Sequence, residues 1–256
     1  MPPRDTAPHS LTVHILHLWR TPVTGKRHRM TSAALQMLPL ALALIASAPL
    51  PVPDTLRDRV IADARAMPPA SLVFERTTRS VRTGGGTTTT LLKVERWDGK
   101  RWQLVSINGK KPTSGQRDEA QKLAASSPVP GYHRMAVLLS GATERTVDGE
   151  GRTVLRIPVL PAGSVRTDSA DISTHLQAEA TLATRAGQPW VERVKVTARE
   201  PFRMNMLIKV MTFEQTSEYR LDDKGRPRLA SQVADSAGTM FGFAGGEKSE
   251  VTYAYR

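Results

Sequence analysis

The stretch "LQAEATLATRAGQPWVERVKVTARE", residues 176–200, determines the predicted fold. Its first half places an apolar residue at every second position, at Leu176, Ala178, Ala180 and Leu182, with mostly polar residues between them. Its second half repeats the pattern with Val194, Val196 and Ala198. Such alternation is typical of strands with one buried face. Because Gly187-Gln188-Pro189 is a turn signal, we expect two neighbouring strands joined by a short loop.

The same period of two recurs on both sides of this stretch. Upstream, "SLVFERTTRSV" (71–81) and "TTTTLLKVERW" (87–97) flank a break at Gly84, Gly85 and Gly86. Asp98-Gly99 then predicts a tight hairpin leading into a third strand. From residue 142 to the end of the chain, strand patterns separated by turn residues indicate about six further strands.

Helical signals occur at two places in the chain. Asp54 is a good N-cap for a first helix whose apolar residues, including Val60, Ile61 and Ala64, fall on one stripe. In the middle, Thr113 to Gln116 forms a capping box, and "YHRMAVLLSG" (132–141) has helical spacing and ends in glycine. The order of elements predicts an α+β fold: a curved antiparallel sheet, or half-barrel, with an N-terminal helix and two mid-chain helices covering one face.

The region before residue 49 has the features of a targeting segment. Lys26, Arg27 and Arg29 precede a short apolar block, and prolines follow it. A positive start, an apolar centre too short to span a bilayer and a small-x-small end at 46–48 are typical of a secretory signal peptide. We therefore expect residues 1–48 to be a leader with a true start at Met30, and residues 49–256 to be a single half-barrel domain. Earlier cleavage, a retained anchor and a buried core helix are the alternatives.

Composition narrows the function classes. The chain of 256 residues has no cysteine, so disulfides and thiolate nucleophiles are excluded. Its formal net charge is +12, but Lys and Arg are interspersed with Asp and Glu, without a basic helix. We interpret the charge as a contribution to solubility or an attraction to anionic lipid surfaces, and we expect no nucleic-acid partner.

No catalytic motif stands out beyond the leader. The two remaining histidines, His133 and His175, belong to different predicted elements, and metal sites need three or four ligands at defined spacing. Gly84, Gly85 and Gly86 lack the G-K-[ST] of a phosphate loop, and "FGFAGGEK" (241–248) lacks dinucleotide-loop spacing. We interpret both as hairpins or bulges, and we predict no enzyme, no metal and no cofactor.

The stretch "FRMNMLIKVM" (202–211) is unusual because it is rich in methionine. Interpreted as one strand, it places Phe202, Met204, Met206, Ile208 and Val210 on one face. Methionine adapts to varied apolar partners, so this face is either the wall of an apolar cavity with the mid-chain helices as a lid, or plain core. The predicted ligand-binding residues are Phe74, Trp102, Leu104, Met135, Leu139, Phe202, Met204, Met206 and Ile208.

A resemblance follows from the element order together with "WDGKRWQLVSINGK" (97–110) and the final "VTYAYR" (251–256). The chain resembles the LolA/LppX-like superfamily of periplasmic lipoprotein carriers and related outer-membrane lipoprotein-sorting proteins. The resemblance implies a half-barrel that holds lipid or lipoprotein acyl chains in the periplasm. The functional arginine of these carriers has no clear counterpart here.

Two functions are therefore expected. The first is a periplasmic, non-enzymatic binder of an apolar ligand, with lipid or an acylated protein as partner and peripheral contact with a membrane. The second is an envelope regulatory or scaffold protein on the same fold, with a filled core and a protein partner. A hydrolase is disfavoured because no paired acid and base are evident.

Overall fold

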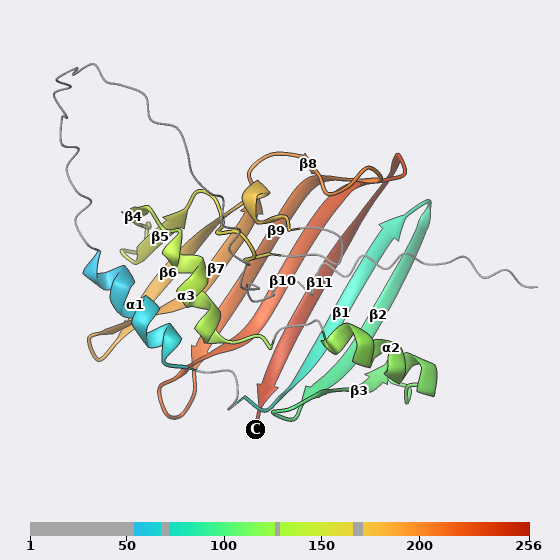
Figure 1. Ribbon diagram of the computed structural model, residues 1–256, viewed down its shortest axis with the longest axis horizontal. Helices are drawn as coiled ribbons and strands as arrows, with labels where there is room; N and C mark the ends of the chain where they lie inside the picture. Colours follow the sequence, from blue (N-terminus) through green and yellow to red (C-terminus); the bar gives the residue numbers. More distant parts are fainter. Residues whose placement is uncertain (1–53, 68–71, 126–128, 166–170) are drawn as a thin grey trace, which may run out of the picture.

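A computed structural model describes residues 54–67, 72–125, 129–165 and 171–256, and within them one 11-stranded sheet contains every strand (Figure 1). The predicted leader, its start at Met30 and its cleavage site lie outside the described residues. The strands are β1 (Phe74–Gly84), β2 (Thr87–Trp97), β3 (Trp102–Ile107), β4 (Glu144–Val147), β5 (Thr153–Ile157), β6 (Leu176–Arg185), β7 (Gln188–Ala198), β8 (Phe202–Arg203), β9 (Ile208–Leu221), β10 (Pro227–Met240) and β11 (Phe243–Tyr255).

The sheet is antiparallel and open. Its order is β3-β2-β1-β11-β10-β9-β7-β6-β5-β4, and β8 pairs with β9 outside this path. Four register shifts occur in three of the ladders: one in β2–β3, one in β6–β7 and two in β9–β10. Such bulges bend and twist strands locally. The predicted α+β class with a curved antiparallel sheet is confirmed.

Helix α1 (Thr55–Arg65) begins where the sequence predicts it. The side chain of Asp54 accepts hydrogen bonds from the backbone N–H groups of Leu56 and Arg57, at 3.1 and 3.2 Å. These bonds satisfy N–H groups that have no partner inside the helix. The buried residues of α1 are Val60, Ile61 and Ala64, so the predicted stripe is confirmed.

The two mid-chain helices lie over different parts of the sheet (Figure 1). The capping box is present at the start of α2 (Ser114–Ala125): Thr113 N–H donates to Gln116 Oε1 at 2.9 Å, and Gln116 N–H donates to Thr113 Oγ1 at 3.3 Å. Helix α2 packs beside β3. The second helix, a 3₁₀ turn at Tyr132–Arg134 followed by α3 (Met135–Ser140), packs against α1 and β5 near the other edge. We call the face that α1 and α3 cover the inner face.

Tyr132 anchors α3 to the sheet. Its hydroxyl accepts a hydrogen bond from the backbone N–H of Val191 at 2.8 Å, beside the bulge between β6 and β7. Its ring packs edge-on against Tyr219, with ring centroids 5.7 Å apart. A buried N–H without a partner would be costly, so this hydroxyl both satisfies the bulged strand and fixes the helix.

The prediction of one continuous strand over residues 202–211 is wrong. Strand β8 ends at Arg203, the chain turns, and β9 begins at Ile208. The side chain of Asn205 holds the turn, because its Oδ1 accepts from the N–H groups of Leu207 and Ile208, both at 2.9 Å. Met204 consequently points into the core at 9% exposure, whereas Met206 is 91% exposed.

Buried apolar side chains form two clusters. The larger one joins α1, α3 and the inner face of β5–β9, and includes Val60, Leu138, Leu155, Phe202 and Phe213. The smaller one joins Leu72, Phe74 and Trp102 with partly buried aromatic rings, and Tyr253 packs against both clusters. Within the described residues, no helix is long and apolar enough to cross a membrane.

Candidate functional site

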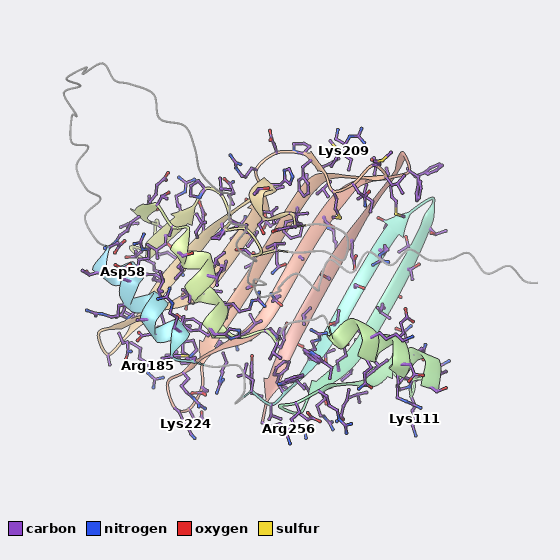
Figure 2. All side chains as sticks on the ribbon, in the orientation of Figure 1. Asp58, Lys111, Arg185, Lys209, Lys224 and Arg256 are labelled. Atoms are coloured by element: carbon purple, nitrogen blue, oxygen red, sulfur yellow. The ribbon has the colours of Figure 1, made fainter. Side chains whose placement is uncertain are left out.

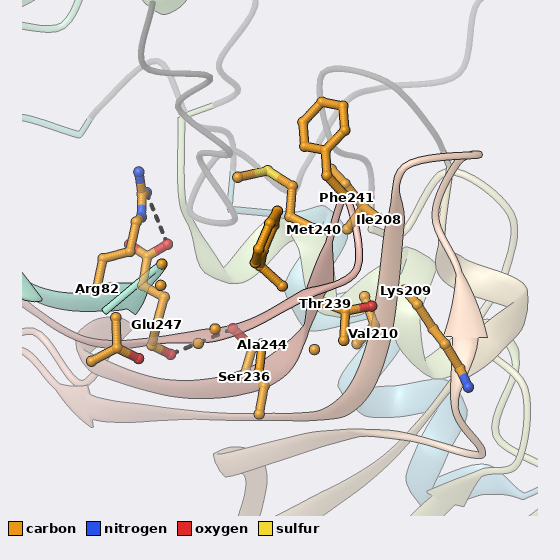
Figure 3. A pocket seen from close by; sticks show the side chains of 18 of the residues that line it. Arg82, Ile208, Lys209, Val210, Ser236, Thr239, Met240, Phe241, Ala244 and Glu247 are labelled. Carbon is orange, nitrogen blue, oxygen red and sulfur yellow. Dashed lines mark hydrogen bonds and ion pairs between the residues drawn. The ribbon is translucent and has the colours of Figure 1, made fainter. Parts of the chain in front are cut away.

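An apolar pocket of about 480 Å³ lies where three hairpins end at one rim of the sheet (Figure 3). The hairpins are β1–β2, β8–β9 and β10–β11, and we call this hollow the rim pocket. Pockets for small ligands commonly measure about 300–1,000 Å³. The volume therefore suits a small molecule or part of an extended chain.

Glycines form the floor of the rim pocket. The register pairs Gly84 with Gly245 and Gly245 with Gly238, which places a row of glycines across β1, β11 and β10. A Cβ atom at Gly245 would lie 2.6 Å from the carbonyl oxygen of Thr83, and one at Gly238 would clash with the carbonyl oxygen of Lys209. At Gly238 and Gly245 the neighbouring strand approaches so closely that no side chain fits, and the floor is left as bare backbone.

The walls of the rim pocket are large apolar side chains. Met204, Ile208 and Val210 come from the β8–β9 side, and Met240 and Phe243 come from the β10–β11 hairpin. Phe243 is 70% exposed and Met240 is 40% exposed, so the pocket is open to solvent on this side. Open apolar surface of this kind marks interaction sites on soluble proteins.

An ion pair bounds the pocket on its inner side. Arg82 Nη2 lies 3.0 Å from Glu247 Oε2, and the Ser236 hydroxyl donates to the Glu247 backbone carbonyl at 3.4 Å (Figure 3). These groups change the character of the inner face from apolar to polar within one register step.

Below this ion pair a polar stripe continues along the inner face. Tyr253 OH donates to Gln232 Oε1 at 2.8 Å, and Gln232 Nε2 donates to Ser217 Oγ at 3.0 Å. Other members are small and buried: Thr78, Ser80, Ser236 and Ser249. This polar stripe lies between the two apolar clusters, so an elongated amphiphilic ligand in the rim pocket would meet hydrogen-bonding groups at one end.

A buried charge cluster forms the far end of the inner face. Arg76 Nε lies 2.8 Å from Glu95 Oε2, Lys93 Nζ lies 3.2 Å from the same oxygen, and the Arg76 guanidinium stacks 4.0 Å from the centroid of the Trp102 ring. Burial raises the pKa of Glu95, but the charges of Arg76 and Lys93 outweigh this effect and lower the pKa to about 2. The carboxylate is therefore ionised at neutral pH and acts as a structural anion.

The two histidines have separate surroundings. Burial, helped by the charge of Arg134, lowers the pKa of His133 to about 4, so the ring is neutral at pH 7. His133 is half-buried. His175 stacks on Phe202 with ring centroids 4.5 Å apart. In the part of the chain that the structure describes, no group of three or more His, Asp or Glu side chains could hold a metal ion.

The predicted ligand-binding residues do not form one site. Met204 and Ile208 line the rim pocket. Met135, Leu139 and Phe202 pack in the larger apolar cluster. Phe74 and Trp102 pack in the smaller one, Leu104 faces a shallow hollow beside α2, and Met206 is exposed.

Sequence reasoning missed Met240 and Phe243. The available signal was the apolar character of the hairpin Met240-Phe241-Gly242-Phe243, where polar turn residues are usual. The sequence predicts only a hairpin or bulge here, and the structure has a hairpin, with positive φ angles of 53° at Phe241 and 85° at Gly242.

Comparisons with known proteins give one distant likeness. No protein-family model matches the sequence, and a search of curated proteins finds no significant match. The structure is similar to a crystal structure of a LolA superfamily protein from Nitrosomonas europaea, with 10% identity and a TM-score of 0.23, covering 78% of this chain and 91% of the other. This is the superfamily that the element order of the sequence resembles.

Proposed function

We propose that the protein is a non-enzymatic binder of an apolar ligand, such as a lipid or the acyl chains of a lipoprotein, and that it acts in the periplasm. The observation that supports this proposal is the rim pocket: an open hollow of about 480 Å³ with a backbone floor and apolar walls. The periplasmic location rests on the predicted signal peptide alone.

The shape of the pocket suits an extended chain better than a compact polar molecule. The glycine floor has no side chain to obstruct a chain lying along it, and the methionines of the wall can adjust to chains of different shape. Each methylene removed from water contributes about 0.8 kcal/mol. A chain of about eight methylenes would gain roughly 6 kcal/mol before the cost of association, so binding of a single acyl chain should be modest.

The polar end of such a ligand has a place to bind. Ser236 and the ion pair of Arg82 with Glu247 lie at the inner side of the pocket. Because the walls are apolar and this side is polar, the ligand would bind in one direction, with its tail towards the hairpin tips.

The test is binding of a fluorescent fatty acid by the purified protein, compared with Met240→Glu and Val233→Glu. Both residues lie on β10 with similar exposure, 40% and 53%, but only Met240 lines the rim pocket. A charge in the pocket wall should weaken binding strongly, and the control should bind like the parent. No binding by the parent, or equal loss in both variants, would contradict the proposal.

The second candidate, a scaffold protein with a protein partner, is favoured by the filled half of the inner face. Over β5–β7 and β9 the helices α1 and α3 leave Val60, Leu138 and Leu176 fully buried. Native mass spectrometry after mild extraction distinguishes the two functions. Co-purified lipid supports the carrier, whereas a lipid-free protein in a defined complex supports the scaffold.

The location is tested separately. We expect the mature chain, taken from a periplasmic fraction, to begin between Ser47 and Pro51. An intact Met1 or Met30 in a cytoplasmic fraction would refute the signal peptide.

A further inference from the structure

Exposed apolar side chains gather at the hairpin tips beside the rim pocket. Met206 and Leu207 lie in the β8–β9 turn, and Phe241 and Phe243 lie in the β10–β11 hairpin. Met206 is 91% exposed, Phe243 70%, Phe241 55% and Leu207 48%. We call these four residues the apolar tip. Single exposed apolar residues are common, but a group at one end of a sheet is a feature of interaction surfaces.

The two halves of the apolar tip are joined through the backbone. Phe241 N–H donates to the Leu207 carbonyl oxygen at 2.9 Å, and Asn205 holds the β8–β9 turn from within. Phe241 adopts a φ of 53°, a conformation in which Asn or Gly is usual and a bulky residue is an outlier. The fold thus presents an aromatic side chain at a position where the backbone favours a small polar one, and such outliers occur where function requires them.

Positive charges lie beside the apolar tip without acidic partners. Arg203 and Lys209 are directly opposite in the β8–β9 ladder, so their side chains share one face. Like charges in this arrangement are destabilising. Neither residue forms an ion pair with any residue that the structure describes.

Other cations of the sheet have acidic partners on a neighbouring strand. Lys195 Nζ lies 3.0 Å from Glu214, and Lys248 Nζ lies 3.2 Å from Asp235, each across a strand pair. Arg220 and Arg228 are also directly opposite, in the β9–β10 ladder, but Arg228 Nε lies 3.2 Å from Asp222 Oδ2. At Arg203 and Lys209 neither cation has such an ion pair with a described residue, so their repulsion is not offset. An anionic partner would remove that repulsion.

We infer that the apolar tip docks on the surface of an anionic lipid bilayer. The four apolar side chains would enter the interface between headgroups and acyl chains, and Arg203 and Lys209 would meet the lipid phosphates. Apolar insertion and electrostatic attraction together are the two contributions that hold peripheral proteins on membranes. Figure 2 shows Lys209 at this end of the strands and Arg185 and Lys224 at the opposite end. Phe241, Phe243 and Lys209 also line the rim pocket, but Arg203, Met206 and Leu207 do not. Substitutions at these last three residues therefore test the inference separately from the proposed ligand.

The experiment is co-sedimentation of the full chain with two kinds of vesicle, phosphatidylcholine alone and equal parts of phosphatidylcholine and phosphatidylglycerol. We expect binding to the mixed vesicles that weakens as salt is added, because salt screens exposed charges. The double variant Met206→Ser and Leu207→Ser should bind at least about tenfold more weakly. Arg203→Gln should bind about fivefold more weakly.

Two matched controls carry the same kinds of substitution elsewhere. Val147→Ser changes an apolar residue, 66% exposed, on the edge strand β4, and Arg185→Gln removes an exposed cation at the end of β6. Both should bind like the parent, and all variants should keep the parent's fatty-acid binding.

Three results would overturn the inference. They are no binding to the mixed vesicles, an effect of Met206→Ser and Leu207→Ser no larger than that of Val147→Ser, or a dimer in sedimentation velocity that this double variant abolishes. The last result would assign the apolar tip to a second copy of the chain. Fatty-acid binding is measured separately, so failure here is distinguishable from failure of the proposed function.

Discussion

Replacing Glu95 with Gln should destabilise the protein far more than replacing Glu75 with Gln. The two glutamates are a matched pair, because Arg76↔Glu95 and Glu75↔Arg96 are consecutive register pairs of β1 and β2. Both form ion pairs, with N–O distances of 2.8 and 3.0 Å. They differ in burial: the side chains of Arg76 and Glu95 are 10% and 7% exposed, whereas those of Arg96 and Glu75 are 35% and 31% exposed.

The expected magnitudes follow from that difference. Glu95→Gln leaves a buried Arg76 without its counter-charge, and removing one member of a buried pair lowers the free energy of unfolding by about 3–5 kcal/mol. Glu75→Gln removes an exposed pair, which contributes at most about 1 kcal/mol. Urea denaturation at pH 7 measures both values.

A pH series tests the contribution of the Glu95 charge in a second way. The pKa of Glu95 falls from its ordinary 4.5 in the unfolded chain to about 2 in the folded one. The ionised carboxylate therefore stabilises the fold above pH 4.5, and this contribution, about 3 kcal/mol, is lost as the pH falls towards 2. Between pH 7 and pH 3 the parent should lose about 2 kcal/mol more than Glu95→Gln.

The reasoning would be refuted by either of two outcomes. One is that Glu95→Gln and Glu75→Gln lower the free energy of unfolding equally. The other is that the parent and Glu95→Gln lose the same stability between pH 7 and pH 3, since the remaining acidic groups are common to both proteins.

Four further substitutions test other parts of the fold by urea denaturation. Met204→Ala should lower the free energy of unfolding by about 2 kcal/mol. This is near the small end of the range for core Met→Ala changes, because one side of Met204 faces the open pocket. Met206→Ala should change the free energy of unfolding by less than about 0.5 kcal/mol, and equal effects would contradict the turn at residue 205. Gly245→Ala should lower the free energy of unfolding by about 2 kcal/mol or more, because the alanine Cβ would meet the Thr83 carbonyl oxygen. An unchanged free energy of unfolding would mean that the strands can separate freely. Tyr132→Phe should lower the free energy of unfolding by about 1–3 kcal/mol and should speed hydrogen exchange of the Val191 amide, which donates to the Tyr132 hydroxyl. Unchanged exchange would show that this amide has another partner.

Local signals explain why much of the fold could be predicted. The N-cap at Asp54 and the capping box at Thr113 each depend on residues within a few positions, so the sequence contains the whole interaction. The alternation in β6 and β7 arises because one face of each strand is buried, and Leu176 and Val194 lie on that face.

The candidate site could not be predicted because its parts meet only in three dimensions. Its floor combines Gly84 with Gly238 and Gly245, which are more than 150 positions away along the chain and meet through strand pairing. Period-two alternation assigns Met204 and Met206 to one face, but the chain turns between them, and the Oδ1 of Asn205 holds this turn by accepting two backbone hydrogen bonds. A periodic pattern cannot reveal such a turn when the residues around it are apolar.

The place of β11 in the sheet has a consequence for how the chain assembles. Strand β11 (Phe243–Tyr255) lies between β1 and β10, so it alone connects β1–β3 to the other strands of the sheet. In the pairing of β1 with β11, Phe74 lies opposite Tyr255, which is near the C-terminus. Contacts of such large separation form slowly, because a long loop must close before they stabilise anything. The folding chain would therefore hold two unjoined sheet fragments with exposed edges until β11 pairs, and it would stay in that state longer than a chain whose neighbouring strands are consecutive in sequence.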